Sequence, residues 1–164
     1  MVADMIRPAH AGDAVAIGRL WQQLVSHHQA MDAAMPRATP DGPMRYGRNL
    51  SDRLADSHTR VFVAEEEGRV VGYVLGVVVD LMPDMFEQQA GGFLADIFVE
   101  ASFRRQGHGR ALVGALTDWF RQQGLGHYEW HVPTSNSDAV AFWRAMGGKP
   151  WQLRMRAELG AWKS

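Results

Sequence analysis

The chain has 164 residues, of which 46% are apolar and 21% charged, and its formal net charge at pH 7 is -1. This length fits one domain, residues 1–164, and the composition is typical of a folded globular protein. The near-neutral charge gives no strong attraction to nucleic acid or to a membrane surface, and the absence of cysteine excludes a disulfide framework and a cysteine nucleophile.

The first ten residues lack the apolar stretch of a secretory signal, and no apolar run is long enough to span a bilayer. We therefore expect a cytoplasmic protein without a membrane segment. No metal site is expected, because the histidines lack the spacing of zinc ligands.

The first half of the chain predicts one short strand, two helices and a hairpin. In chain order these are an edge strand at 5–9, a helix at 14–28, a loop at 31–43, a helix at 44–55, and strands at 59–65 and 70–80. In the second helix, Tyr46, Leu50 and Leu54 follow at four-residue spacing. Gly72 and Gly76 inside the last of these strands indicate a bulge or a close backbone approach.

The second half predicts alternating strands and helices. In order these are a loop at 81–92, a strand at 93–99, a helix at 110–123, a strand at 128–132, a helix from about 137 to 146, and a half-exposed strand at 153–158. A right-handed crossover from 93 to 132 would make the fourth and fifth strands parallel.

A basic, glycine-rich loop separates the strand at 93–99 from the next helix. Its sequence is Arg104-Arg105-Gln106-Gly107-His108-Gly109. A strand, a glycine loop and a helix N-terminus together favour phosphate, because backbone N–H groups and the helix dipole face the anion. The loop lacks the Gly-Lys-Ser/Thr of a P-loop and the third glycine of the dinucleotide fingerprint.

The pattern R-x-x-G-x-G resembles the acetyl-CoA pyrophosphate loop of the GNAT N-acetyltransferase superfamily. A second segment, Asn136-x-x-Ala139-x-x-Phe142-Trp143, resembles the second acetyl-CoA segment of the same family. The order of the elements is also similar to the GNAT fold. This resemblance implies a mixed α/β (α+β) fold: a mostly antiparallel sheet of six to seven strands with a parallel fourth and fifth strand, flanked by about four helices.

The resemblance also implies where acetyl-CoA would lie. The pantetheine arm would run along Ile97, Phe98 and Val99, in an open wedge between the fourth and fifth strands. The residues implied for the pyrophosphate are Arg104, Arg105, Gln106, Gly107, His108, Gly109 and Arg110. The second segment would contribute Asn136, Ala139, Phe142 and Trp143.

For the proton transfers, the resemblance implies a carboxylate base near the fourth strand, where Asp96 and Glu100 lie; by alternation these two share one face. The family often has a tyrosine acid where this chain has Trp143, and an indole N–H is no usable proton source. Tyr128 and Ser135 are the substitutes that we consider, and water is a third.

Three functions follow as hypotheses. The first is an N-acetyltransferase that transfers the acetyl group of acetyl-CoA directly to a primary amine of a small molecule or peptide. The second is a noncatalytic acyl-CoA-binding module, and the third is a nucleotide-binding α/β domain with a similar loop. Members of the GNAT family often dimerise, so the resemblance also allows for a homodimer.

Overall fold

A computed structural model describes residues 5–80, 82 and 84–161 of the chain. The strands are β1 (Ile6–Pro8), β2 (Thr59–Glu66), β3 (Arg69–Val79), β4 (Gly91–Val99) and β5 (Tyr128–Glu129). The helices are α1 (Ala14–Met31), α2 (Gly42–Asp52), α3 (His108–Gln122) and α4 (Ser137–Ala145), and short 3-10 turns occupy Ala11–Asp13, Ala101–Phe103 and Leu159–Ala161.

The five strands form one sheet in the order β1-β2-β3-β4-β5. Neighbours are antiparallel except β4 and β5, which are parallel as the crossover predicts. The mixed fold and its four α-helices are confirmed within the described residues. The expectation of six to seven strands is wrong, because the sheet of these residues has five.

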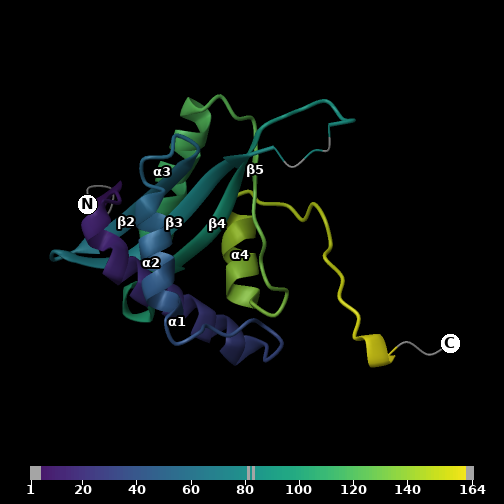
Figure 1. Cartoon of the computed structure of the whole chain (residues 1–164), viewed down its shortest axis with the longest axis horizontal. Coiled ribbons are helices and arrows are strands. Elements are labelled where there is room, and N and C mark those ends of the chain that lie inside the picture. Colours follow the sequence, from purple (N-terminus) through teal and green to yellow (C-terminus); the bar gives the residue numbers. More distant parts are fainter. Residues whose placement is uncertain (1–4, 81, 83, 162–164) are drawn as a thin grey trace.

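The missing strand is the one predicted at residues 153–158, which form no regular structure. Leu153 and Met155 are 73% and 78% exposed. Alternation of apolar and polar residues predicts a strand only where a neighbouring strand is available to pair with it. In this structure the segment stands away from the sheet (Figure 1).

Helices cover both faces of the sheet, and each face has its own apolar cluster (Figure 1). On one face, α1 and α2 supply Ile17, Leu20, Leu24 and Leu50. On the other face, α3 and α4 supply Leu112, Val113, Leu116, Trp119, Phe120 and Trp143. No helix in the described part of the chain is long and apolar enough to cross a membrane.

The crossing of α1 and α2 requires glycine at its contact points. A Cβ on Gly47 would lie 2.0 Å from the carbonyl oxygen of Ala14, and one on Gly18 would lie 2.2 Å from that of Pro43. Because these neighbours are backbone atoms, a methyl group at either site has no room. The two glycines thus set how closely α2 lies against α1.

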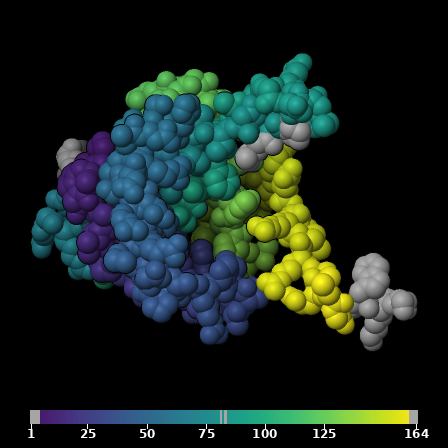
Figure 2. All heavy atoms as spheres, viewed as in Figure 1, coloured from purple at the N-terminus to yellow at the C-terminus, as the bar shows by residue number. Residues whose placement is uncertain are grey.

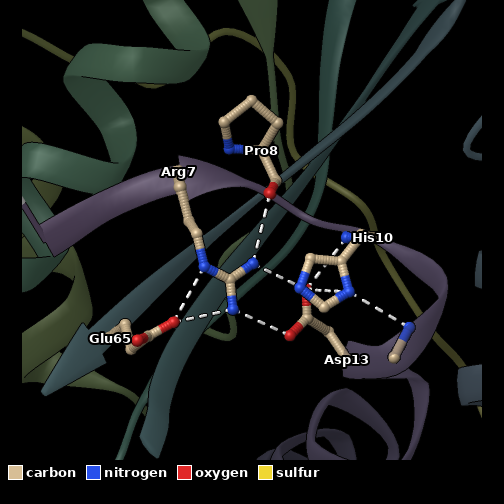
Figure 3. A network of polar contacts seen from close by, with 6 residues as sticks. Arg7, Pro8, His10, Asp13 and Glu65 are labelled. Atoms are coloured by element: carbon tan, nitrogen blue, oxygen red, sulfur yellow. Dashed lines mark hydrogen bonds and ion pairs between the residues drawn. The ribbon is translucent and has the colours of Figure 1, made fainter. Parts of the chain in front are cut away.

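A polar network ties β1 to β2 and to the start of α1 (Figure 3). Arg7 donates to Asp13 at 2.8 and 2.9 Å and to Glu65 at 2.8 Å. Burial alone would raise the pKa of Asp13, but the hydrogen bonds from Arg7 and from the backbone N–H of His10 outweigh it and lower that pKa. Asp13 is therefore held as a buried, paired carboxylate.

Candidate active site

The site is built around an irregularity in β4. Leu75 pairs with Asp96 but the next residue, Gly76, pairs with Leu94, so Ala95 is an extra residue on β4. The sequence predicts a bulge or a close backbone approach at Gly72 and Gly76, and the bulge found here lies opposite Gly76 with its extra residue on β4. It turns Asp96 toward α1 and α2, while Leu94 packs in the cluster on the α3 face.

The sheet opens between β4 and β5. The two strands pair at only two positions, Gly92 with Tyr128 and Phe93 with Glu129. Beyond Phe93, no described strand pairs with the outer edge of β4, which continues to Val99. This edge offers backbone N–H and C=O groups to an extended ligand, in the place where the sequence predicts a wedge.

The glycine-rich loop follows the end of β4 directly. Arg105 and Gly107 have positive φ angles of 61° and 94°, and α3 begins at His108, two residues before the predicted start at Arg110. The first helical bond of α3 runs from the N–H of Ala111 to the carbonyl of Gly107. The N–H groups of His108, Gly109 and Arg110 therefore lie at the free end of the helix, beside a loop that is exposed from Arg104 to Gly107.

Two side chains of this loop have contacts within the protein: His108 is buried, and Arg104, although exposed, lies against the end of β4. His108 is 1% exposed, lies against Phe103, and has Nε2 3.1 Å from a carboxylate oxygen of Glu66. Arg104 donates from Nε to the carbonyl of Val99 at 2.9 Å and lies over the ring of Phe98. The backbone N–H of His108 is therefore exposed at the N-terminus of α3 to a bound anion, whereas its imidazole is buried on the other side.

A cavity of about 520 Å³ lies between α1 and the end of β4. Burial lowers the pKa of His27, which lies in its wall, and the charge of Arg104 lowers it further, while Asp138 acts in the opposite direction. Helix α1, the end of β4 and the beginning of the glycine-rich loop therefore meet at this cavity. The lining residues are Arg19, Gln22, Gln23, Ser26, His27, Phe98, Ala101 and Arg104.

The second predicted segment forms α4 and meets the loop. The side-chain oxygen of Asn136 accepts a hydrogen bond from the N–H of Ala139 at 3.0 Å and caps the helix. A Cβ on Gly109 would lie 3.7 Å from the ring of Phe142, so the two segments are in contact. Trp143, the next residue, lies in the apolar cluster on the α3 face instead. It is 6% exposed and packs on Trp130 with ring centroids 4.6 Å apart.

Asp96 lies under an aromatic group on the α2 face. Tyr46 donates its hydroxyl hydrogen to a carboxylate oxygen of Asp96 at 2.6 Å, and the hydroxyl group of Tyr73 donates to the Tyr46 hydroxyl oxygen at 3.4 Å. Trp21 stacks on Tyr46 with a centroid distance of 4.9 Å. Burial raises the pKa of Asp96, and the hydrogen bond from Tyr46 offsets only part of this effect.

Glu100 shares the face of Asp96 but has a different environment. It is 5% exposed and forms ion pairs with Arg19 and with Arg69. Burial would raise the pKa of Glu100, but the two arginines outweigh burial and lower it. Glu100 is therefore fixed as an ion pair between α1, β3 and the end of β4.

The two predicted acid candidates lie elsewhere. Tyr128 stacks on Phe120 at 5.4 Å, and its hydroxyl oxygen accepts a hydrogen bond from Thr117 on α3 at 3.4 Å. Its side chain is thus on the α3 face, whereas Asp96 is on the α2 face. Ser135 is exposed in the turn before α4.

Sequence reasoning missed Tyr46 as part of the site. Its spacing with Leu50 and Leu54 indicated a buried helix face, and this was the available signal. Contact with Asp96, fifty residues later in the chain, depends on the α1–α2 crossing and on the β4 bulge. The described residues contain no group of three or more histidine, aspartate and glutamate side chains placed to hold a metal ion.

Known proteins share the fold, and a family model matches most of the sequence. The chain matches the acetyltransferase (GNAT) family over residues 24–147. It is 34% identical over 71 residues to L-ornithine N5-acetyltransferase NATA1 of Arabidopsis thaliana; the match covers 42% of this chain and 31% of that relative, less than a third of its length.

Two solved structures show the same fold. A mutant BH1408 protein of Bacillus halodurans has a TM-score of 0.84 at 20% identity, covering 94% of this chain and 98% of that one. The aminoglycoside N-acetyltransferase AAC(6')-Iy in complex with CoA has a TM-score of 0.70 at 19% identity, covering 93% and 97%. With the family match spanning most of the sequence, the chain belongs to the GNAT family of acetyltransferases.

Proposed function

We propose that this protein is an N-acetyltransferase that transfers the acetyl group of acetyl-CoA directly to a primary amine of a small molecule or peptide. The observation that carries the proposal is the meeting of two features at the end of β4. The unpaired edge of β4 ends at Val99. The glycine-rich loop, which has positive φ angles at Arg105 and Gly107, and the free N-terminus of α3 follow it directly. A long thioester with a pyrophosphate at one end matches this combination.

The backbone supplies most of the binding groups in this proposal. The pyrophosphate lies against the N–H groups from Gln106 to Arg110, where the helix dipole also favours negative charge. The pantetheine arm runs along residues 97–99 as an added strand. Phe142 packs beside it, and the amide nitrogen of Asn136 is available to the arm because only its oxygen is used in the cap.

Asp96 accepts the amine proton in the proposed reaction. A primary amine arrives as an ammonium ion and transfers one proton to the carboxylate, which burial has made more basic. The neutral nitrogen then attacks the thioester carbonyl, and a backbone N–H at Phe98 or Val99 stabilises the oxyanion. The nitrogen of the tetrahedral intermediate gives its second proton to water, the C–S bond breaks to leave the neutral amide, and the departing thiolate takes a proton from water.

Water is the proton donor that we favour, because Tyr128, one of the two side chains considered for this role, is on the face of the sheet opposite Asp96. Ser135, the other, is exposed in the turn before α4, and Trp143, which stands where the family often has tyrosine, is buried in the apolar cluster. The names of two relatives support an amine acceptor, since one acetylates ornithine and the other an aminoglycoside.

Ligand-induced thermal stabilisation tests the cofactor. Acetyl-CoA and CoA are expected to raise the melting temperature of the protein, whereas ATP and NAD at the same concentration leave it unchanged. Stabilisation by ATP or NAD without stabilisation by CoA would favour the nucleotide-binding domain and contradict the proposal. The burial of Trp143 keeps the noncatalytic acyl-CoA-binding module as a second candidate, and turnover separates it from the enzyme.

A further inference from the structure

The cavity at the end of β4 has a polar wall on its α1 side, to which the proposed function assigns no role. The side chains of this wall are spaced three or four residues apart and so share one face of the helix. They are Arg19, Gln22, Gln23, Ser26 and His27. The apolar face of the same helix, with Ile17, Leu20 and Leu24, packs on the sheet instead. A cavity of about 520 Å³ with such a wall favours a polar ligand.

Arg104 connects this cavity to the glycine-rich loop, because it lines the first and begins the second. Its Nε donates to the carbonyl of Val99, whereas its two Nη groups have neither an acceptor nor a carboxylate partner in the part of the chain that the structure describes. The other arginine of the wall, Arg19, is paired with Glu100. The guanidinium charge of Arg104 is therefore available to an anion in the cavity.

His27 adds a second group that can carry positive charge. Among the described residues its imidazole has no hydrogen-bond partner, and its ring centroid is 6.3 Å from that of His28. Burial and the charge of Arg104 lower the pKa of His27 below its ordinary value of 6.5, so the ring is mostly neutral at pH 7 in the free protein. Asp138 acts in the opposite direction from the start of α4, which lies next to the second half of α1 (Figures 1 and 2).

We propose that Arg104 and His27 bind one phosphate group of the CoA pyrophosphate from the α1 side, while the backbone N–H groups at the start of α3 bind the other. This assignment rests on the proposed function, which supplies the pyrophosphate. The charge of Arg104 is permanent, whereas His27 takes up a proton from the solvent as the anion binds. The charged or titratable groups that surround His27 are Arg104 of the loop, Asp138 of α4, and Arg19 and His28 of α1.

The proton taken up by His27 makes the affinity for the pyrophosphate depend on pH. A bound anion favours the protonated ring and raises the pKa of His27. The gain in affinity is complete below the pKa of His27 in the free protein, and it is lost as the pH rises through the higher pKa of the complex. A close opposite charge of this kind should change the affinity by about tenfold between the two limits.

Calorimetric titration with dephospho-CoA, from about pH 7.5 to about pH 5.5, tests the assignment. This probe keeps the pyrophosphate but lacks the 3′-phosphate, which ionises at about pH 6 and would obscure the protein's own proton uptake. The affinity of the wild type is expected to rise about tenfold over this range. The variant His27→Gln has no group to protonate here and is expected to bind no more tightly at the low end of the range than at the high end.

His28→Gln is the matched control, because His28 neighbours His27 on α1 but does not line the cavity. It is expected to keep the pH dependence of the wild type, and both variants should keep the circular dichroism spectrum of the wild type. A rise in affinity that persists in His27→Gln would overturn the proposal, as would a wild-type affinity that does not change with pH. Both results would leave CoA binding by the loop intact, whereas a wild type that binds neither CoA nor dephospho-CoA would contradict the proposed function itself.

Discussion

Asp96 in β4 and Glu100 just after its end are carboxylates on the same face of the sheet, and their surroundings shift their pKa values in opposite directions. Burial raises the pKa of Asp96 and leaves it one hydrogen-bond donor, Tyr46. Two arginines lower the pKa of Glu100 and fix it in place. The first carboxylate is suited to take up a proton, and the second to hold three elements together.

Changing each carboxylate to its amide separates these roles. Asp96→Asn is expected to lower the acetylation rate by roughly 100-fold or more, the usual contribution of a general base, with CoA affinity unchanged. Its melting temperature at pH 7 should not fall, because the variant removes a charge that burial disfavours. Glu100→Gln is expected to do the reverse, with a lower melting temperature and a rate per folded molecule near that of the wild type.

Steady-state kinetics and thermal denaturation check both variants. A rate for Asp96→Asn equal to the wild-type rate at every pH would remove Asp96 from the mechanism. A large loss of rate in fully folded Glu100→Gln would contradict its assignment as a structural ion pair.

Tyr46 is expected to control the pH at which Asp96 works. Tyr46→Phe removes the hydrogen bond that lowers the pKa of Asp96, so the acidic limb of the pH–rate profile should move to higher pH. Above that limb the rate should stay within roughly a factor of ten of the wild type, since one hydrogen bond contributes about 1 kcal/mol. An unshifted acidic limb in the folded variant would show that Tyr46 does not act on the base.

At the scale of elements, the proposed function assigns the pyrophosphate to the loop and the start of α3. Gly107→Glu places bulk and negative charge at the helix end, and we expect CoA affinity to fall by roughly 100-fold, or about 2.8 kcal/mol. Gly124→Glu is the matched control, because Gly124 also has a positive φ, of 76°, and has open space around it. Calorimetric titration of CoA should show the loss only in the first variant; equal affinity in both would contradict the assigned loop.

The crossing of α1 and α2 positions Tyr46 over Asp96, and glycine at the contact makes it possible. Gly47→Ala is expected to lower the free energy of unfolding by about 2 kcal/mol or more, because the methyl group meets a backbone oxygen. Gly114→Ala in α3 is the control, since nothing lies within 4 Å of its added Cβ and alanine favours a helix. Urea denaturation that shows the same stability for both variants would contradict the close approach.

Elements with a periodic apolar pattern were predictable from the sequence, and elements that depend on tertiary partners were not. Leu112, Val113 and Leu116 repeat with the helix period and form α3, although the helix starts earlier because Gly107 adopts the left-handed cap. Residues 153–158 have a strand pattern, but the pattern cannot state whether a neighbouring strand exists in the same chain. The partner of Asp96 was hidden for a similar reason, because its contact with Tyr46 joins two distant segments.

At the scale of the whole molecule, buried carboxylates with lowered pKa values make stability depend on pH. The folded-state pKa of Asp13 is below its ordinary value of 3.8, so its contribution is complete above that pH and is lost as the pH falls through the folded-state pKa. The lowered pKa of Glu100 likewise makes the protein less stable as the pH falls. The raised pKa of Asp96 has the opposite effect on stability, which it lowers as the pH rises.

Arg7→Met tests this dependence at the network of Figure 3. At pH 7 the variant is expected to be less stable by about 2 kcal/mol, because Asp13 stays 4% exposed and loses its counter-charge. Urea denaturation at decreasing pH should show that the difference in unfolding free energy between the variant and the wild type becomes smaller as Asp13 takes up a proton. A difference that stays constant down to about pH 3 would contradict the lowered pKa.

The most direct test of the whole account is release of CoA thiol from acetyl-CoA in the presence of a panel of primary amines. The chain has no cysteine, so the protein adds no background to the thiol signal. We expect thiol release that depends on at least one amine, with an equal amount of the N-acetylated amine found by mass spectrometry. Binding of CoA without amine-dependent release on any member of the panel would contradict catalysis and leave the acyl-CoA-binding module.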